Sequence, residues 1–287
     1  MDVTNHMNQI QIITDAGSDI IDCSRPDLTV LPMTIRFGEE EYLDGVNLTH
    51  KQFYEKMIET QVLPTTSQPS PYAFETAIRK IHEQGDIALI ITISSKLSGT
   101  WQSANIAAAE TGGEVYIVDS LNVAVGEKAI VEYALRMKDA GTDIHTIVDT
   151  LNREKENLRV IALLDTLEYL QKGGRISKTV AFVGGALAIK PVVAIVDGKV
   201  ILLGKARGSK NGENFLMREA EKAGLDFSRP LCLGYTGFSD AMLQKYIEDS
   251  RHLWEGHEDS LPVCTIGATI GTHIGPNAIA LSFFEKK

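Results

Sequence analysis

The chain has 287 residues, of which 44% are hydrophobic, enough for one large hydrophobic core or two ordinary ones. Its 28 lysines and arginines against 38 acidic residues give a formal net charge of −10, which argues against non-specific binding to nucleic acid or to an anionic membrane surface. The longest apolar stretch, residues 180–196, is interrupted by two glycines, a lysine and a proline, whereas a bilayer span needs about 20 mostly apolar residues. Since no signal-peptide pattern opens the chain, we expect a soluble, cytoplasmic protein without stable membrane insertion.

The three cysteines, Cys23, Cys232 and Cys264, are far apart in the sequence and form no Cys-x-x-Cys pair. No histidine-rich stretch lies beside them, so we predict no metal site. Cys232 and Cys264 lie in apolar runs, which is typical of small core residues in a reducing compartment.

The first half of the chain alternates between strand and helix patterns. Strand patterns cover residues 10–14, 87–93 and 115–118, and helix patterns cover residues 49–60, 71–84 and 125–138, with a further helix of small residues through Ala104, Ala107 and Ala108. Residues 29–37 and 41–43 are expected to form a hairpin around Gly38 and Glu39. Because alternating strands and helices give right-handed parallel crossovers, we predict a doubly wound parallel sheet with helices on both faces.

The pattern changes after a helix predicted at residues 144–156. Further strands are predicted at residues 160–164, 263–268 and 278–283, and further helices at residues 167–172, 179–189 and 240–253. Residues 191–196 and 199–205 flank Asp197-Gly198, a two-residue turn typical of an antiparallel hairpin. The predicted fold class is therefore α/β with two domains, a doubly wound parallel-sheet domain at residues 1–158 and a mixed-sheet α+β domain at residues 159–287. The early hairpin could pack on either domain.

Three short segments are rich in hydroxyl groups: residues 64–70, 94–100 and 271–276. Two of them directly follow apolar runs that are predicted as buried strands, where an α/β protein presents polar groups to a ligand. Ser98 lies between a strand and a helix, so its hydroxyl and the amides of Gly99 and Thr100 can converge on an anion at the positive end of that helix. Alternatively, Ser98 only caps its own helix.

The other two segments also allow two interpretations. Pro64 and Pro69 stiffen the loop around Thr66, which limits the entropy lost on ligand binding, but the same loop could simply cap the helix that starts near Pro71. His273 is flanked by glycines that permit close backbone approach, yet a lone histidine is more often structural than functional. Together the segments offer hydrogen-bonding groups and one imidazole but no evident acid–base machinery. This favours a protein that binds an oxyanion over one that breaks bonds.

Three motifs are specific in combination: Thr66-Ser67-Gln68-Pro69, Leu97-Ser98-Gly99-Thr100 and Thr272-His273-Ile274-Gly275-Pro276; residues 172–177 and 205–208 add to them. In these motifs, and over nearly the whole chain, the sequence resembles the DegV family of bacterial fatty-acid-binding proteins. The resemblance implies one long-chain fatty acid held in a tunnel between two domains. It assigns the carboxylate to Thr66, Ser98 and His273, with supporting amides and hydroxyls from Ser67, Gly99, Thr100 and Thr272.

The resemblance also implies a partner. Members of the family present the bound acid to a separate ATP-dependent fatty-acid kinase, which forms the acyl phosphate. Arg175 and Arg207 match positions expected near the docking face for that kinase, and their glycine-flanked loops are expected to expose both side chains. The chain would then be a carrier without cofactor or catalytic residues. It departs from the commoner family pattern at Lys96, Trp101 and Asn277, and these changes bear on the shape of the pocket.

The energetics of a long acyl chain agree with this interpretation. Each buried methylene contributes about 0.8 kcal/mol, so a tail of about 16 carbons supplies on the order of 10 kcal/mol before association costs. Hydrogen bonds to a charged group add only about 1.5–3 kcal/mol each, so the polar residues should set orientation more than affinity. The apolar helix predicted at residues 179–189 is a candidate wall of the tunnel, or simply a core helix.

Two other functions remain open from the residues alone. An acyl hydrolase or transferase could use Ser98 as nucleophile, His273 as base and Asp119 to orient the base, although the chain lacks a Gly-x-Ser-x-Gly motif. Gly173-Gly174-Arg175 could contact a nucleotide, although no phosphate-binding Gly-x-x-x-x-Gly-Lys-Ser/Thr loop is present.

Overall fold

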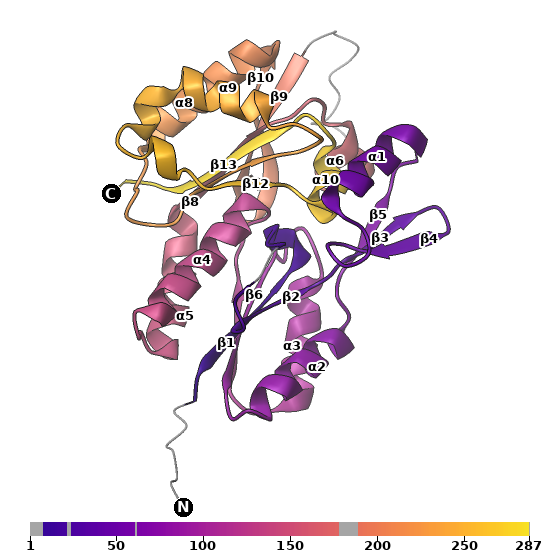
Figure 1. The fold of residues 1–287 in the computed structure, drawn as a ribbon, viewed down its shortest axis with the longest axis vertical. Helices are drawn as coiled ribbons and strands as arrows, with labels where there is room; N and C mark the ends of the chain where they lie inside the picture. The colour runs from indigo at the N-terminus through magenta and orange to yellow at the C-terminus, as the bar shows by residue number, and fades with distance from the viewer. Residues whose placement is uncertain (1–7, 22–23, 61, 178–188, 287) are drawn as a thin grey trace, which may run out of the picture.

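The computed structural model describes residues 8–21, 24–60, 62–177 and 189–286. A four-stranded parallel sheet forms the lower half of the molecule as drawn in Figure 1. Its strands, in spatial order, are β2 (Leu28–Leu31), β1 (Ile10–Asp15), β6 (Ile87–Thr92) and β7 (Val115–Asp119). All three pairings are parallel, as the alternation of strands and helices predicts.

Helices cover both faces of this sheet. They are α2 (Pro71–His82) and α3 (Thr100–Thr111) on one face, and α4 (Val125–Asp139) and α5 (Ile144–Glu154) on the other. Side chains alternate along each strand, so Ile13 and Ile90 pack under α2 and α3 while Ile12 and Leu89 pack under α4 and α5. The predicted doubly wound domain is confirmed.

A six-stranded mixed sheet forms the upper half. Its strands, in spatial order, are β10 (Lys199–Arg207), β9 (Ile189–Val196), β8 (Leu158–Leu163), β13 (Ile279–Phe284), β11 (Cys232–Tyr235) and β12 (Val263–Thr265). Helices α8 (Ser209–Ala223) and α9 (Ala241–Asp249) cover one face, and α4, α6 (Glu168–Lys172) and α10 (Ala268–Ile274) lie on the other. The proposed domain boundary after residue 158 falls at the start of β8 and stays a prediction.

Helix α4 lies between the two sheets and joins them. Its first turn approaches the mixed sheet so closely that a Cβ on Gly126 would lie 2.4 Å from a methyl carbon of Val160. A Cβ on Gly234 of β11 would likewise lie 2.7 Å from a methyl carbon of Val125. Glycine at both positions therefore permits the sheets to share this helix.

The early hairpin belongs to a third, antiparallel sheet in the order β4-β3-β5. Its members are β3 (Thr34–Phe37), β4 (Glu40–Leu43) and β5 (Thr65–Ser67), and α1 (His50–Thr60) packs beside them. Ile35, Phe53 and Tyr54 are buried against Ala268 of α10, so this unit packs on the C-terminal part of the chain. The packing brings Thr66 in β5 close to α10.

Several predicted elements are wrong in detail. The single strand predicted at residues 29–37 is two strands in two different sheets, because Pro32 lacks the N–H that a continuous strand would use. The strand predicted at residues 263–268 stops at Thr265, and the polar segment after it is the helix α10. Residues 64–70, predicted as a loop, contain β5. Helix α8 and strand β11 were not predicted.

Other expectations are confirmed or lie outside the described residues. Asp197 and Gly198 have φ values of 49° and 77° and join β9 to β10 in the predicted antiparallel hairpin. Cys232 is buried and Cys264 half-buried, with free thiols whose sulfur atoms are 3.6 Å apart. Cys23 and the helix expected at residues 179–189 are outside the described residues, apart from Ile189, which begins β9. Short 3-10 turns complete the chain: Ala16–Ser18, Lys155–Asn157, Arg251–Trp254 and Glu258–Ser260.

Candidate functional site

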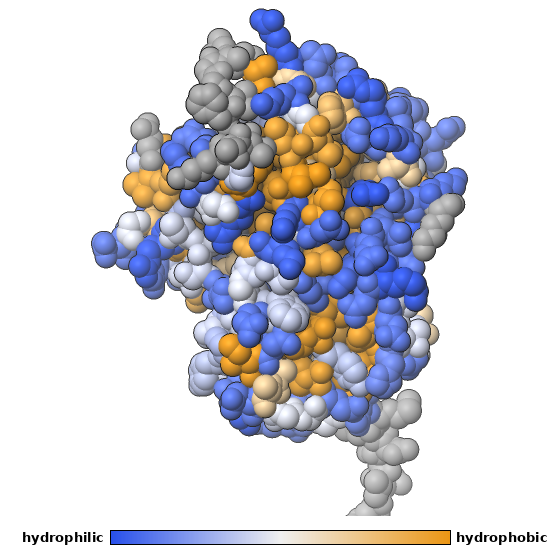
Figure 2. Space-filling view, turned by 180° about the vertical axis from the view of Figure 1, so that it is seen from behind, coloured by the Kyte–Doolittle hydropathy of each residue, from blue (hydrophilic) through white to orange (hydrophobic). Residues whose placement is uncertain are grey.

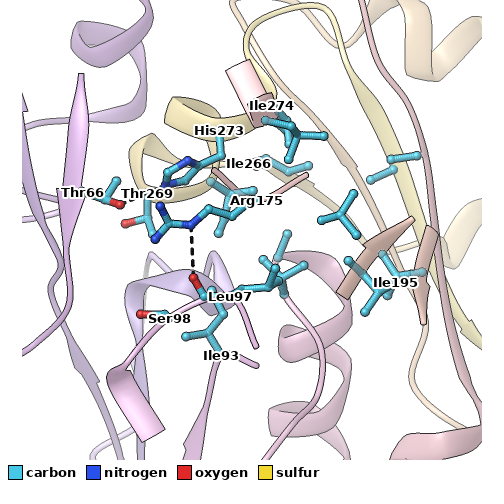
Figure 3. Close-up of a pocket in the computed structure, with 18 of the residues that line it drawn as sticks. Thr66, Ile93, Leu97, Ser98, Arg175, Ile195, Ile266, Thr269, His273 and Ile274 are labelled. Atoms are coloured by element: carbon cyan, nitrogen blue, oxygen red, sulfur yellow. Dashed lines mark hydrogen bonds between the residues drawn. The ribbon is translucent and has the colours of Figure 1, made fainter. Parts of the chain in front are cut away.

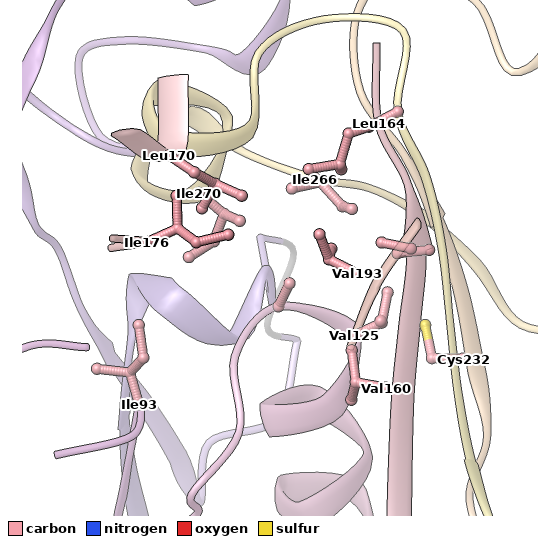
Figure 4. Packing of buried hydrophobic residues seen from close by; sticks show 14 of the residues in the cluster. Ile93, Val125, Val160, Leu164, Leu170, Ile176, Val193, Cys232, Ile266 and Ile270 are labelled. Atoms are coloured by element: carbon pink, nitrogen blue, oxygen red, sulfur yellow. The ribbon is translucent and has the colours of Figure 1, made fainter. Parts of the chain in front are cut away.

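A cavity of about 430 Å³ lies between the two large sheets. The mixed sheet supplies apolar side chains to its wall, among them Val160, Ala162, Val193 and Ala280, and the parallel-sheet half supplies Ile93. Figure 4 shows several of these side chains converging on the space between α4, α10 and the sheet. The volume is within the range of about 300–1,000 Å³ that is usual for small-molecule sites.

The polar lining gathers at one end of this cavity. Thr66, Ser98, Arg175, Thr269 and His273 lie together there, and the opposite wall is apolar (Figure 3). The hydroxyl oxygen of Thr66 lies 2.9 Å from His273 Nε2, although the two residues are 207 positions apart in the sequence. The structure therefore brings together two of the three residues assigned to a carboxylate, with Ser98 on the same wall.

The hydrogen bond between Thr66 and His273 has a preferred direction. His273 Nδ1 is buried, has no partner among the described residues, and faces Gly173, where a Cβ would lie 2.3 Å away. A buried N–H without an acceptor is costly and rarer than an unused lone pair, so the proton belongs on Nε2. His273 then donates to the Thr66 oxygen, and the Thr66 hydroxyl hydrogen is free to point into the cavity.

His273 is neutral at neutral pH. Burial, together with the positive charge of Arg175, lowers the pKa of His273 to about 4. A neutral imidazole with its proton on Nε2 is the form that the unpartnered Nδ1 requires. The polar end of the cavity thus offers neutral hydrogen-bond donors beside one permanent positive charge, that of Arg175.

Ser98 precedes helix α3 but is not its N-cap, which is Gly99. The Ser98 hydroxyl lies 2.8 Å from the hydroxyl oxygen of Thr100 and accepts a long hydrogen bond of 3.4 Å from the Thr100 amide. Ser98 therefore accepts one hydrogen bond from the first residue of α3, as a capping residue would, although Gly99 holds the N-cap position. Ser98 also lines the cavity, so both interpretations hold for the same side chain.

The four supporting residues are not placed alike. Ser67 lines the cavity, whereas Gly99, Thr100 and Thr272 are not among the described lining residues. The Thr272 hydroxyl donates to the Ala268 carbonyl within α10, at 2.8 Å. The Gln68 amide packs on Gly99, and a Cβ there would lie 2.3 Å from Gln68 Oε1, so a larger residue would displace the Gln68 side chain.

The two arginines have different environments. Arg175 is half-buried, and the expectation that it is exposed is wrong, because its side chain folds back into the cavity wall. Its Nε donates to the Leu97 carbonyl at 3.2 Å (Figure 3), and its Nη1 donates to the Gly173 carbonyl at 2.6 Å. Arg207 is exposed at the end of β10 and does not line the cavity.

An outer groove of about 650 Å³ lies beside the cavity and shares Leu97, Arg175 and Val200 with its wall. Apolar residues of β10 line this groove, and Lys96 and Lys199 lie at its sides. Figure 2 shows that the rear face of the molecule carries an apolar area surrounded by hydrophilic residues.

Three residues in or beside the site were given no role from the sequence: Gln68, which appeared there only within a motif, Thr269 and Asp44. Thr269 and Gln68 line the cavity, and Gln68 Nε2 donates to the Ser103 hydroxyl at 2.9 Å. Asp44 accepts two hydrogen bonds from Thr269. Gln68 lies within the hydroxyl-rich segment at residues 64–70 and Thr269 lies just before the one at residues 271–276, so their positions could have indicated both residues from the sequence. No local sequence pattern indicates Asp44.

The alternative enzyme sites are not assembled among the described residues. The Ser98 hydroxyl pairs with Thr100 and makes no hydrogen bond to His273. Asp119 accepts the amides of Ser95 and Leu121 and does not reach His273, whose Nδ1 a catalytic carboxylate would have to hold. The amides of Gly173, Gly174 and Arg175 donate to backbone carbonyls of the preceding helix, so these three N–H groups do not form a phosphate-binding loop.

Over the part of the chain that the structure describes, no three metal-ligating side chains come together at a potential metal site. None of the helices in those residues is long and apolar enough to cross a membrane.

The fold and the site together define an α/β protein with two large sheets and a largely apolar cavity between them, whose polar lining gathers at one end. The chain matches the family model described as "Uncharacterised protein, DegV family" over residues 9–286. It is 32% identical to the DegV domain-containing protein TTE1491 of Caldanaerobacter subterraneus subsp. tengcongensis over 98% of this chain and 100% of that protein. This chain therefore belongs to the DegV family.

Solved structures share the whole fold. The fatty-acid-binding DegV family protein from Thermus thermophilus superposes with a TM-score of 0.86 and is 29% identical, over 97% of this chain and 100% of that one. The Streptococcus pneumoniae Fatty Acid Kinase (Fak) B3 protein loaded with linoleic acid also gives a TM-score of 0.86, with 22% identity over 97% of this chain and 100% of that one. At 22% identity the second likeness establishes the fold alone.

Proposed function

We propose that this chain is a cytoplasmic carrier that binds one long-chain fatty acid in the cavity between its two large sheets. The observation that carries the proposal is the arrangement of the cavity, which is apolar over most of its wall and polar at one end. The Thermus thermophilus relative binds fatty acid and shares the fold over its whole length, which supports the same ligand class here.

In the proposed complex the carboxylate lies at the polar end, against Thr66, Ser98 and His273. The Thr66 hydroxyl, oriented by His273, and the Ser98 hydroxyl donate to the carboxylate oxygens. Arg175 contributes positive charge from the same end of the cavity. Each buried methylene of the tail adds about 0.8 kcal/mol, so the apolar wall supplies most of the affinity.

We further propose that the bound acid is presented to an ATP-dependent fatty-acid kinase, which transfers the phosphoryl group to the carboxylate. The Streptococcus pneumoniae protein of the same fold is named as a fatty acid kinase B protein, which supports a partner of this kind. Arg207 and the Arg175 end of the outer groove are the candidate docking points. Lys96 and Lys199 add positive charge there, in a chain whose net charge is −10.

Native mass spectrometry of the purified protein, followed by organic extraction, tests the ligand. We expect a mass increment equal to one fatty acid, which extraction then identifies. No co-purified fatty acid, together with no uptake of one that is offered, would refute the proposed ligand.

The partner is tested separately with Arg207→Ala. This variant should bind fatty acid like the wild type, since Arg207 is outside the cavity, but support less acyl-phosphate formation by a fatty-acid kinase. Arg79→Ala on α2 removes another exposed arginine and is the matched control. Weaker lipid binding by Arg207→Ala would instead assign this arginine to the ligand site, and unchanged kinase turnover would remove it from the docking face.

A further inference from the structure

The first turn of α10 is held by a buried carboxylate from a distant part of the chain. Asp44 Oδ2 accepts the Thr269 amide at 2.8 Å and the Thr269 hydroxyl at 2.6 Å. Both residues are buried, with exposed fractions of 6% for Asp44 and 2% for Thr269. The other oxygen, Oδ1, has no hydrogen-bond partner among the described residues and lies 3.8 Å from His50 Nε2.

Two more contacts fix the approach to α10. Asp19 Oδ1 accepts the Gly267 amide at 2.7 Å, and the Tyr54 hydroxyl donates to the Ile266 carbonyl at 2.9 Å. The packing here is tight, because a Cβ on Gly267 would lie 2.2 Å from His50 Nε2. The start of α10 therefore has little freedom to rotate or shift.

This fixed turn determines where the imidazole lies. Thr269 and His273 are four residues apart in α10, so they lie on the same face of the helix, and both line the cavity. A rotation of α10 that released Thr269 from Asp44 would also carry His273 away from Thr66.

Thr66 is placed by the same structural unit that supplies Asp44. Thr66 pairs with Ile35 in the three-stranded sheet, and Asp44 directly follows β4 of that sheet. The Asp44 amide donates to the Met33 carbonyl at 3.0 Å, which ties the carboxylate to the residue just before β3. One small unit thus holds both partners of the bond between Thr66 and His273.

We propose that Asp44 is a positioning residue for the carboxylate site: through Thr269 it sets the rotation of α10 that places the Nε2 hydrogen of His273 on Thr66. The effect on lipid binding rests on the proposed function, whereas the effect on the imidazole does not. A side chain that only stabilised the fold would leave the state of His273 unchanged in variants that remain folded.

The test compares Asp44→Ala with Asp44→Asn by ¹⁵N NMR of the histidine side chains. The asparagine amide oxygen can still accept both Thr269 hydrogens, and its NH₂ group takes the place of the oxygen that has no partner. We expect wild type and Asp44→Asn to show His273 as the Nε2–H tautomer with a slowly exchanging proton. In Asp44→Ala that proton should exchange fast, and fatty-acid binding should weaken by about tenfold or more.

Asp27→Ala is the matched control for lost stability. Asp27 is another buried carboxylate, and it pairs with Arg25 and Lys138 rather than with α10. This variant should lose stability but keep the His273 signals and the lipid affinity of the wild type. If Asp44→Ala does not fold, Thr269→Ala replaces it, because that variant loses one of the two hydrogen bonds and should show a smaller change of the same kind.

The outcomes separate the two proposals. A folded Asp44→Ala with an unchanged His273 tautomer and proton exchange would overturn the positioning role, whatever its lipid affinity. If Asp44→Ala alters the His273 signals while the wild type takes up no fatty acid, the positioning role is supported and the proposed ligand is refuted.

Discussion

Replacement of Thr66 by valine removes the hydroxyl between His273 and the cavity while keeping the branched shape of the side chain. In the proposed complex this hydroxyl donates to a carboxylate, and a hydrogen bond to a charged group is worth about 1.5–3 kcal/mol. The dissociation constant for a fatty acid should therefore rise by about 10- to 150-fold. Part of this loss comes from His273 Nε2, which loses its partner in the variant.

Competition with a fluorescent fatty acid measures this effect for a shorter and a longer saturated acid. The loss should be equal for both, because Thr66 is at the polar end and the tail is elsewhere. Thr66→Ser keeps the hydroxyl and should remain close to wild type, and Thr76→Val on the exposed side of α2 is the matched control. The reasoning fails if Thr66→Val binds within about twofold of wild type, or if the loss grows with chain length.

Three other variants test the cavity, a turn and the imidazole. Ala280→Val should narrow the apolar end of the cavity, where Ala280 pairs with Ala162. Each methylene of the tail that is displaced should raise the dissociation constant about fourfold. In the same assay, long acids should therefore lose more affinity than short ones. Gly198→Ala should lower the free energy of unfolding in urea by about 1–2 kcal/mol, because φ is +77° and the new Cβ would lie 2.5 Å from Ser94 Oγ; an unchanged midpoint would contradict this. Burial lowers the pKa of His273 from 6.5 to about 4 in the folded protein, so the unfolded chain binds the proton more readily. As the pH falls from 6.5 to about 4, the free energy of unfolding of the wild type should therefore decrease by up to about 3 kcal/mol relative to that of His273→Gln. A difference in urea midpoints that does not vary with pH would exclude a neutral buried imidazole.

The sequence predicts the parallel half of the fold well because its signals are local. Strands β6 and β7 are each followed directly by a helix, and this alternation indicates parallel crossovers, whereas the place of β2 in the same sheet was not predicted. Helix α8 escaped prediction because Gly208, Asn211 and Gly212 open it, and only a narrow stripe of it is buried. Gly212 is nonetheless needed, since a Cβ there would lie 2.4 Å from a methyl carbon of Leu163.

The polar segments were easier to find in the sequence than the way they come together. Three hydroxyl-rich segments indicated an oxyanion site, and the family resemblance assigned it to Thr66, Ser98 and His273, but neither β5 nor α10 was predicted where two of these residues lie. Thr66 reaches His273 only because β5 pairs with β3 while α1 packs on α10. Thr66 and His273 are 207 positions apart, and no local periodicity encodes a contact over that separation.

The neutral state of His273 bears on how the proposed carrier would give up its ligand for chemistry. An imidazolium against the carboxylate would hold it by charge and would draw electron density from the oxygen that must attack the phosphorus. Burial and the charge of Arg175 lower the pKa of His273 to about 4, so in the proposed complex the neutral imidazole orients the Thr66 hydroxyl, and the hydroxyls of Thr66 and Ser98 are the neutral donors to the acid. Most of the binding free energy would then come from the tail, with smaller contributions from the two hydroxyls and the charge of Arg175. In the proposed complex the carboxylate would keep its negative charge and its nucleophilic oxygen until the partner kinase supplies ATP.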